Sequence, residues 1–406
     1  MKKYKLLILI ILCVSIILVA SMPYKSVDKY LKRNHSDLNL ADEYDFSGLE
    51  ILSKDIKDKK IILAGELHNL AENHIVELKL LKYLQKEIGV NYYLAEVGYA
   101  DAYFLNKYLE SGDETVLKNY FNIYKNQKYY TEEQYNFYIN MYKHNQTLPK
   151  EKQIKVIGVD IESKVTYDYI LDVIKDKENT TNELKVLMNK LKEFNYNSRD
   201  SYKNILKVLN NLTEDIKLNE EKYKNLFKKD FEEFKLVLKN LIDLSTACTG
   251  NIIYDNVRDK YIYENFKVID SKLENAVYFG QWGYFHVFQD TFYSNIDMSD
   301  MNYFSSLLNK DEKYRGKILS INYGYYFEEP QLGHGYSYID ENLFKDYLNS
   351  DSKATIFSLN NRKSPFKEKT INPFSTNAVD YKNNPTTKYF QYLILIRNSE
   401  KSKIVM

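Results

Sequence analysis

The stretch Lys60-Ile61-Ile62-Leu63-Ala64-Gly65-Glu66-Leu67-His68 decides the fold. It starts as a short, mainly apolar run, typical of a strand buried on both faces, and leads directly into an acid and a histidine. Asn69 can cap the helix that follows, where Ile75, Leu78 and Leu81 recur at helical spacing. A buried strand followed by such a helix is the repeating unit of a parallel α/β sheet.

Further runs of the same kind recur along the chain, separated by long helical stretches. This alternation predicts the α/β class, with a mainly parallel (mixed) sheet and helices on both faces. The predicted strands are Lys60–Ala64, Tyr92–Ala95, Lys155–Val159, Ala276–Phe279, Lys317–Tyr323, Ala354–Leu359 and Phe390–Ile396.

One large domain is predicted over residues 44–398, and the residues from Ser399 onward are expected to fray. Within this domain, residues 180–244 are rich in Lys, Glu and Leu and contain no Pro or Gly. That composition predicts a helical insertion of two or three helices that covers one edge of the site. A partner-binding hairpin is the alternative role for this segment.

The N-terminus has the pattern of an export signal. Three lysines stand among the first five residues, before an uncharged and almost wholly apolar run that ends at Met22. At about 1.5 Å per residue, this run is slightly short of a ~30 Å hydrocarbon core, so residues 1–22 suit either a cleaved signal peptide or an uncleaved membrane anchor. Residues 23–43 are predicted to be a polar tether, and the lysines place the main domain outside the cytoplasm, secreted or anchored to the membrane.

Charge and cysteine content exclude several classes of protein. The 57 basic and 56 acidic residues nearly cancel, so no global field favours nucleic acid, and none is expected as a partner. Cys248 is the only cysteine beyond the N-terminal segment, so the main domain forms no internal disulfide, and this thiol is interpreted as structural.

Candidate chemistry lies where the predicted strands end. The motifs GxxxxGK[ST], GxGxxG, GxSxG and HExxH are absent from the sequence, which disfavours nucleotide transfer, dinucleotide redox and serine hydrolase chemistry. In an open parallel sheet, the side chains at the carboxyl ends of the strands converge on one crevice. The polar residues at four such ends are Glu66 and His68, Glu96, Asp160 and Glu162, and Gln281 followed by His286.

The residue types at these ends suit acid–base chemistry. A histidine with an ordinary pKa near 6.5 serves as a general base at neutral pH, so we expect His68, positioned by Glu66, to activate water. Glu96 stands between apolar neighbours and is expected to be partly buried and to assist proton transfer. No cofactor is certain. A divalent metal, if one is bound, would take Glu66, His68 and His286 as ligands.

Several motifs in this order resemble the erythromycin esterase-like superfamily, whose wider relatives include TIKI-type, TraB-type and haem-binding ChaN-type proteins. The resemblance extends from about residue 50 to residue 290. It is carried by Gly65-Glu66-Leu67-His68, Leu94-Ala95-Glu96 followed by Asp101-Ala102 and Leu105-Asn106, Tyr130-Thr131 through Val156–Asp160, Arg258-Asp259 with Glu264-Asn265, and the run from Val277 to His286.

The resemblance implies a catalytic site made of Glu66, His68, Glu96, Arg258 and His286. The residues expected to contact substrate beside it are Asp160, Glu162, Asp259, Gln281 and Trp282. One residue, Leu67, separates the acid and histidine of the first motif where the esterases have two, which is closer to the haem-binding and metalloprotease branches.

These features predict an exported hydrolase that cleaves an ester or amide bond in a small-molecule or peptide substrate. In this hypothesis, His286 and Arg258 stabilise the developing oxyanion. The alternative is a non-catalytic extracellular protein that binds a small ligand or haem in the same crevice, with Tyr99 or Tyr284 as an iron ligand.

Overall fold

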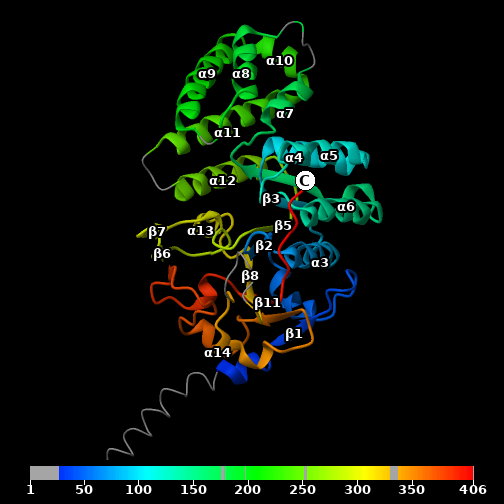
Figure 1. Cartoon of the computed structure of the whole chain (residues 1–406), viewed down its shortest axis with the longest axis vertical. Helices are drawn as coiled ribbons and strands as arrows, with labels where there is room; N and C mark the ends of the chain where they lie inside the picture. Colours follow the sequence, from blue (N-terminus) through cyan, green and yellow to red (C-terminus); the bar gives the residue numbers. More distant parts are fainter. Residues whose placement is uncertain are drawn as a thin grey trace, which may run out of the picture.

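An eight-stranded mixed sheet forms the centre of the computed structural model, which describes residues 27–174, 178, 180–196, 198–250, 254–329 and 337–405 (Figure 1). The strand order is β1-β9-β11-β8-β2-β5-β3-β4. β9 runs antiparallel to both its neighbours, and every other adjacent pair is parallel, which confirms the predicted α/β class. The strands are β1 (His35–Leu38), β2 (Ile61–Glu66), β3 (Tyr92–Gly98), β4 (Lys155–Asp160), β5 (Tyr278–Gly283), β8 (Ile318–Tyr326), β9 (Ala354–Ser358) and β11 (Tyr392–Arg397).

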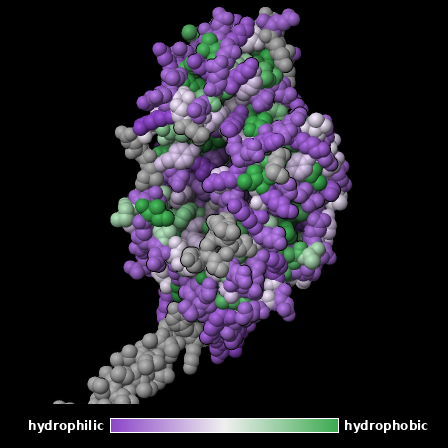
Figure 2. All heavy atoms as spheres, viewed as in Figure 1, coloured by the Kyte–Doolittle hydropathy of each residue, from purple (hydrophilic) through white to green (hydrophobic). Residues whose placement is uncertain are grey.

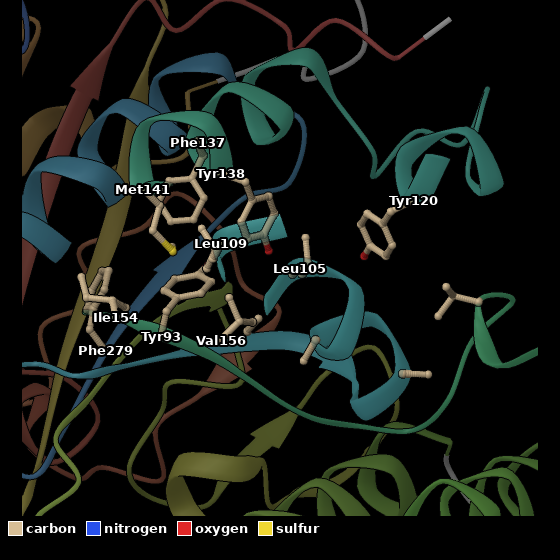
Figure 3. Close-up of a cluster of buried hydrophobic side chains, with 14 of the residues drawn as sticks. Tyr93, Leu105, Leu109, Tyr120, Phe137, Tyr138, Met141, Ile154, Val156 and Phe279 are labelled. Carbon is tan, nitrogen blue, oxygen red and sulfur yellow. The ribbon is translucent and has the colours of Figure 1, made fainter. Parts of the chain in front are cut away.

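Helices cover both faces of the sheet because successive strand residues point to opposite sides. In β2, Ile62 and Ala64 pack into the hydrophobic core shared with α3, α4 and α6. Ile61 and Leu63 pack on the other face, against α12 and α13. Figure 3 shows part of the first core, where Tyr93 of β3 packs among the side chains of α4 and α6. The helices are α3 (Ala71–Ile88), α4 (Tyr99–Ser111), α5 (Glu114–Ile123), α6 (Glu132–Gln146), α7 (Thr166–Val173), α12 (Tyr254–Asp270) and α13 (Phe304–Lys310).

The order of the central strands creates the crevice of the sheet. β5 lies between β2 and β3 although it follows both in the sequence, so the carboxyl ends of β2, β5, β3 and β4 are neighbours. The pairing register of β3 with β4 shifts between Ala95 and Gly98. Such irregularities are common beside functional sites because they redirect a side chain. Glu96 lies within this irregularity.

The predicted helical insertion is present and packs beyond the β4 edge of the sheet (Figure 1). It contains four α-helices where two or three were expected, and no strand is found among its described residues. Its last helix packs against α12 and α4, and so connects the insertion to the crevice. The helices are α8 (Asn182–Lys192), α9 (Arg199–Leu218), α10 (Glu220–Phe227) and α11 (Phe231–Thr249).

A second, aromatic-rich core lies under the C-terminal third of the chain. It packs beside a small antiparallel sheet in the order β10-β6-β7. The remaining α-helices and strands are α2 (Ser53–Ile56), β6 (Phe292–Ser294), β7 (Ser299–Met301), α14 (Glu341–Phe344) and β10 (Val379–Asp380).

Part of the segment predicted as a polar tether, residues 23–43, belongs to the sheet instead. His35–Leu38 forms the edge strand β1 and pairs with residues 354–357 of β9. Its sequence, His-Ser-Asp-Leu, contains one apolar residue, Leu38, which is buried. This strand exists because a distant strand offers its edge, which the local pattern does not reveal.

The last residues pack against the domain, contrary to the expected fraying. The backbone N–H of Ala71, at the start of α3, donates to Glu400 O at 2.9 Å, and that of Glu132, at the start of α6, donates to Lys403 O at 2.7 Å. Because the first N–H groups of a helix have no partner within the helix, the C-terminal segment Ser399–Val405 stabilises two helix N-termini at once.

The predicted leader, residues 1–22, lies outside the described residues. No helix among the described residues is both long and apolar enough to cross a membrane. Hydrophilic residues dominate the face of the molecule in Figure 2, and the hydrophobic ones are scattered in small groups.

Candidate functional site

Five of the ten predicted site residues line one pocket of about 380 Å³, which lies at the carboxyl ends of β2, β3 and β5. Glu66, His68, Glu96, Arg258 and Gln281 line it directly. The full lining is Glu66, His68, Asn69, Asn73, His74, Glu77, Tyr93, Ala95, Glu96, Val97, Tyr129, Tyr130, Thr131, Gln134, Tyr138, Arg258 and Gln281.

Glu66 and His68 form a pair at the end of β2. His68 Nδ1 donates to Glu66 Oε1, since an ionised carboxylate can only accept. The other oxygen of Glu66 accepts from Asn73 Nδ2, and Asn73 Oδ1 in turn accepts from Tyr325 OH at 2.7 Å. These bonds fix the orientation of the His68 ring and leave its Nε2 for a ligand.

The Glu66 carboxylate raises the pKa of the His68 imidazole to about 9, although burial opposes the charge. The side chain of His68 is 46% exposed, so the ring reaches solvent through the pocket. Without substrate, His68 is therefore protonated at neutral pH, unlike an ordinary histidine.

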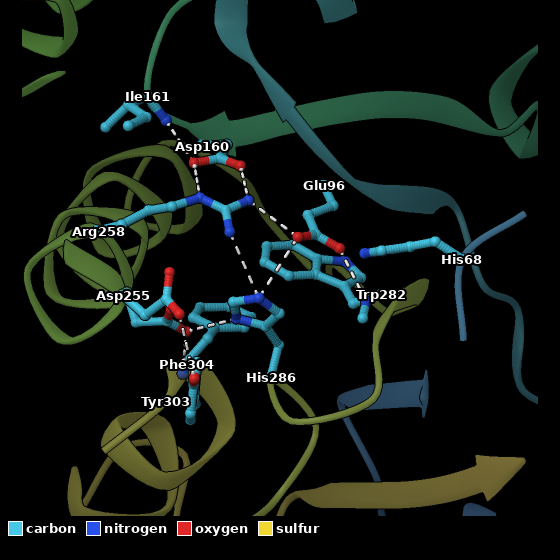
Figure 4. Close-up of polar contacts among 12 residues, drawn as sticks. His68, Glu96, Asp160, Ile161, Asp255, Arg258, Trp282, His286, Tyr303 and Phe304 are labelled. Atoms are coloured by element: carbon cyan, nitrogen blue, oxygen red, sulfur yellow. Dashed lines mark hydrogen bonds and ion pairs between the residues drawn. The ribbon is translucent and has the colours of Figure 1, made fainter. Parts of the chain in front are cut away.

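Arg258, on α12, is held by two carboxylates from different strands (Figure 4). Its Nε donates to Asp160 Oδ1 at 3.0 Å, and its Nη2 donates to Asp160 Oδ2 and, at 2.8 Å, to Glu96 Oε1. A forked guanidinium suits such multiple pairing, and it fixes the position of the one arginine that lines the pocket.

His286 lies behind this ion pair, in the turn after β5. Its Nδ1 donates to Asp259 Oδ1 at 2.8 Å, and Asp259 also accepts from the Phe304 backbone N–H at 2.6 Å. Its Nε2 lies 3.4 Å from Glu96 Oε1 (Figure 4). Burial opposes the charge of His286, but Asp259 and Glu96 raise its pKa. His286 therefore supports Glu96 and does not itself line the pocket.

Glu96 is ionised despite its burial. Burial alone would raise its pKa, but the positive charges of His286, Arg258 and His68 outweigh burial and lower the pKa to about 2. Its Oε2 also accepts from the Gly283 backbone N–H at 2.8 Å. With that pKa, Glu96 neither donates a proton nor accepts one readily at neutral pH, so the expected proton-transfer role is replaced by an electrostatic one.

The other residues expected to contact substrate play different parts. Asp160 and Asp259 hold Arg258 and His286 from behind, and only Gln281 lines the pocket. The Gln281 Oε1 atom is buried and has no hydrogen-bond partner within the described residues. Because a buried acceptor without a donor is costly, a ligand donor is its natural partner.

Trp282 and Glu162 are structural in this fold and do not line the pocket. The Trp282 side chain is buried, donates from Nε1 to Leu94 O at 2.7 Å and stacks on Phe304. Glu162 accepts from the first backbone N–H groups of α4, Tyr99 at 3.1 Å and Ala100 at 3.2 Å. It lies in a neighbouring cavity, lined in part by the helical insertion.

A second histidine–glutamate pair lines the same pocket and was not singled out from the sequence. His74 Nδ1 bonds to Glu77 Oε2 at 2.8 Å, and Tyr93 OH donates to Glu77 Oε1. The available signal was the polar group Asn73, His74 and Glu77 in the first two turns of α3. The sequence does not show whether these side chains face the sheet or solvent, because that depends on how the helix packs.

The suspected metal ligands do not fit a metal site. The described residues contain no group of three or more His, Cys, Asp or Glu side chains placed to hold a metal ion. His286 faces Asp259 through Nδ1, and its Nε2 lies 3.4 Å from the Arg258 guanidinium, whose permanent charge would repel a metal cation.

The tyrosines suggested as haem ligands do not line the pocket either. Tyr284 is buried among Phe285, Phe288 and Phe374. Tyr99 borders a different cavity.

A comparison with known protein families finds a match in the N-terminal half of the domain. Residues 52–235 match the family described as haem-binding uptake, Tiki superfamily, ChaN. A search of curated proteins finds no match.

Several solved structures share the fold of this chain. A protein from Bacillus cereus is 17% identical, with a TM-score of 0.67 over 94% of this chain and 99% of that one. A mutant of the erythromycin esterase EreC in its open conformation is 13% identical, with a TM-score of 0.65 over 89% and 96%. A succinoglycan biosynthesis protein is 16% identical, with a TM-score of 0.64 over 94% and 98%. The family match and the shared fold confirm the predicted resemblance to the erythromycin esterase-like superfamily and its haem-binding relatives.

Proposed function

We propose that this chain, which has the fold of an erythromycin esterase, hydrolyses an ester or amide bond in a small-molecule or peptide substrate. One observation carries the proposal: His68 is held through Nδ1 by Glu66, so that its Nε2 faces a polar pocket beside the buried Arg258–Glu96 pair. An oriented imidazole can act as the general base for water, and a fixed positive charge can stabilise the oxyanion that forms in acyl hydrolysis.

In the proposed reaction, His68 Nε2 accepts a proton from water as the water oxygen attacks the substrate carbonyl. Arg258 is the fixed cation that lines the pocket, and it stabilises the oxyanion that develops. Glu96 and Asp160 hold its guanidinium, so little reorganisation is needed when that charge forms. His286, held by Asp259, keeps Glu96 ionised.

The raised pKa of His68 gives this reaction a distinctive pH dependence. A general base must lose its proton before it can accept one, and the profile of kcat/KM reports the free enzyme. We expect kcat/KM to rise with pH up to about 9, the pKa of His68. A profile that instead falls through pH 9 would assign His68 as an acid.

The test is a panel of ester and amide substrates offered to the purified full-length chain. His68→Ala is expected to lower kcat/KM by at least ~10²-fold, the usual contribution of a positioned base. His35→Gln is the matched control, because His35 lies on the opposite edge strand, β1. An unchanged rate in the His68 variant removes this residue from the mechanism.

A second candidate function, binding of haem or another small ligand without turnover, is favoured by the family match over residues 52–235. Titration of the same protein with haem tests it. A Soret band that saturates at a fixed stoichiometry, together with no hydrolysis of any panel substrate, would establish binding in place of catalysis.

We also propose that the main domain works outside the cytoplasm, secreted or attached to the membrane by an uncleaved leader. The lysines and the apolar run before Pro23 support this location. Protease treatment of intact cells should degrade the domain, and N-terminal sequencing distinguishes a cleaved from a retained leader. A domain that stays protected until the cells are lysed contradicts export.

A further inference from the structure

The pocket contains two histidines of matching arrangement. In each, Nδ1 bonds to a glutamate, Glu66 for His68 and Glu77 for His74, and the opposite ring nitrogen is left over. Within the described part of the chain, Nε2 of His74 has no hydrogen-bond partner, and the side chain is 21% exposed. Both rings belong to the lining of the same pocket.

We propose that His74 is a second catalytic residue, which gives its proton to the leaving group in the hydrolysis proposed above. The inference rests on that proposed function and completes it, because an alkoxide or amide anion is a poor leaving group unless it is protonated as it departs.

Several other polar groups of the pocket are poorer sources of this proton than His74. Glu96 is already ionised, and Arg258 does not release a proton in proteins. Both oxygens of Glu66 accept hydrogen bonds, one of them from His68. Burial raises the pKa of Tyr130 and Tyr138 well above the usual value, which makes their hydroxyls weak acids.

The surroundings of His74 suit a proton donor. Burial opposes the charge of the ring, but the carboxylates of Glu77 on the same helix, Glu66 on β2 and Glu133 on α6 raise its pKa. Tyr93 on β3 donates to Glu77 and holds that carboxylate in place. These charges favour the protonated form of the His74 imidazole, and the ring belongs to the lining of the pocket.

Both histidines take part in the proposed hydrolysis. The water oxygen bonds to the carbonyl carbon, and His68 Nε2 takes the water proton. The bond from that carbon to the leaving oxygen or nitrogen then breaks, and the leaving atom takes the proton of His74 Nε2. The products are a carboxylic acid and an alcohol or amine, and exchange with solvent returns both imidazoles to their initial states.

The experiment compares two esters of one acid, an ethyl ester and a 4-nitrophenyl ester, in the purified full-length chain. The 4-nitrophenolate ion leaves without protonation, whereas ethoxide does not. His74→Gln, which keeps a side chain able to bond to Glu77, should lower kcat/KM for the ethyl ester by at least ~10²-fold and change that for the 4-nitrophenyl ester less than about threefold. His68→Ala should lower both.

Glu77→Gln provides a second readout if the His74 variant folds poorly. As a positioning residue, Glu77 should affect the ethyl ester more than the aryl ester, in the same sense but less strongly. Equal losses on both esters would make His74 structural, and no loss on either would remove it from the reaction; both results overturn this inference alone. Absence of hydrolysis by the unmodified chain would overturn the proposed function instead.

Discussion

Glu66 controls the chemistry of His68 through charge as well as orientation. Its carboxylate is the main cause of the raised pKa of this imidazole, and its second oxygen is anchored by Asn73. A histidine that is charged at neutral pH binds anionic groups well and acts as a base in alkaline solution. The residue that sets the working pH is therefore Glu66.

We predict that Glu66→Gln lowers the pKa of His68 from about 9 toward 6.5, because the amide keeps a hydrogen-bond acceptor but removes the negative charge. NMR titration of the imidazole measures this shift. The rising limb of kcat/KM should move to lower pH with it. Glu50→Gln is the control, because the Glu50 side chain is exposed and does not line the pocket.

The same shift carries a stability consequence of defined sign. A histidine whose pKa is higher in the folded state stabilises that state below pH 6.5, and the contribution is lost as pH rises to about 9. In Glu66→Gln this contribution should be reduced. A pKa that stays near 9 in the variant would show that Glu66 is not its source.

Among the elements, the end of strand β4 and the start of helix α4 show how a predicted site residue can serve the fold instead. Glu162, just beyond β4, caps the first turn of α4, and it accepts from Asn240 of α11 at 3.2 Å. One carboxyl group thus connects the sheet, a helix N-terminus and the helical insertion. Burial raises its pKa to about 8.

We predict different outcomes for Glu162→Ala and Glu162→Gln. The alanine variant loses the cap and should be less stable by about 1 kcal/mol. The glutamine variant keeps an acceptor. Because the folded-state pKa is raised from 4.5 to about 8, the wild-type contribution is complete below pH 4.5 and is lost as pH rises to 8. Glu162→Gln should therefore gain stability relative to wild type across that window.

Denaturant unfolding at several pH values measures both variants. A constant difference between wild type and Glu162→Gln from pH 5 to pH 9 would contradict the raised pKa. Equal stability of the alanine variant and wild type would contradict the capping role.

On the scale of the whole molecule, the C-terminal segment ties the pocket rim to the domain. In addition to its bonds to α3 and α6, Ser402 N–H donates to Asn69 O at 2.9 Å, and Val405 N–H donates to Tyr130 O at 3.1 Å. Asn69 and Tyr130 both line the pocket. Figure 1 shows this segment, in red, passing α3 and ending beside α6.

We predict that deletion of residues 399–406 lowers the free energy of unfolding by about 2 kcal/mol, since two helix N-termini lose their acceptors. KM should rise more than kcat falls, because the deletion loosens the rim and leaves His68 and Arg258 in place. Lys401→Ala, at an exposed side chain, is the control and should match wild type. Unchanged stability and KM in the deletion would show that the segment does not hold the rim.

The sequence by itself determined the class of the fold and placed five of the ten predicted site residues at one pocket. The seven predicted strands recur as β2, β3, β4, β5, β8, β9 and β11, because strands buried on both faces need continuous apolar runs that stand out between helices. Glu66, His68, Glu96 and Gln281 meet at one pocket, since parallel strands bring their carboxyl ends to one edge. Arg258 reaches the same pocket from α12.

Tertiary structure alone decided which polar residues face that pocket and which support it. His74 and Glu77 face it because of how α3 packs, whereas Trp282 and Glu162 satisfy bonds inside the fold. The edge strand β1 and the bound C-terminal segment depend on distant backbone groups that need partners. Local periodicity encodes burial, but the direction of a side chain and the partner of a backbone group are set by contacts distant in sequence.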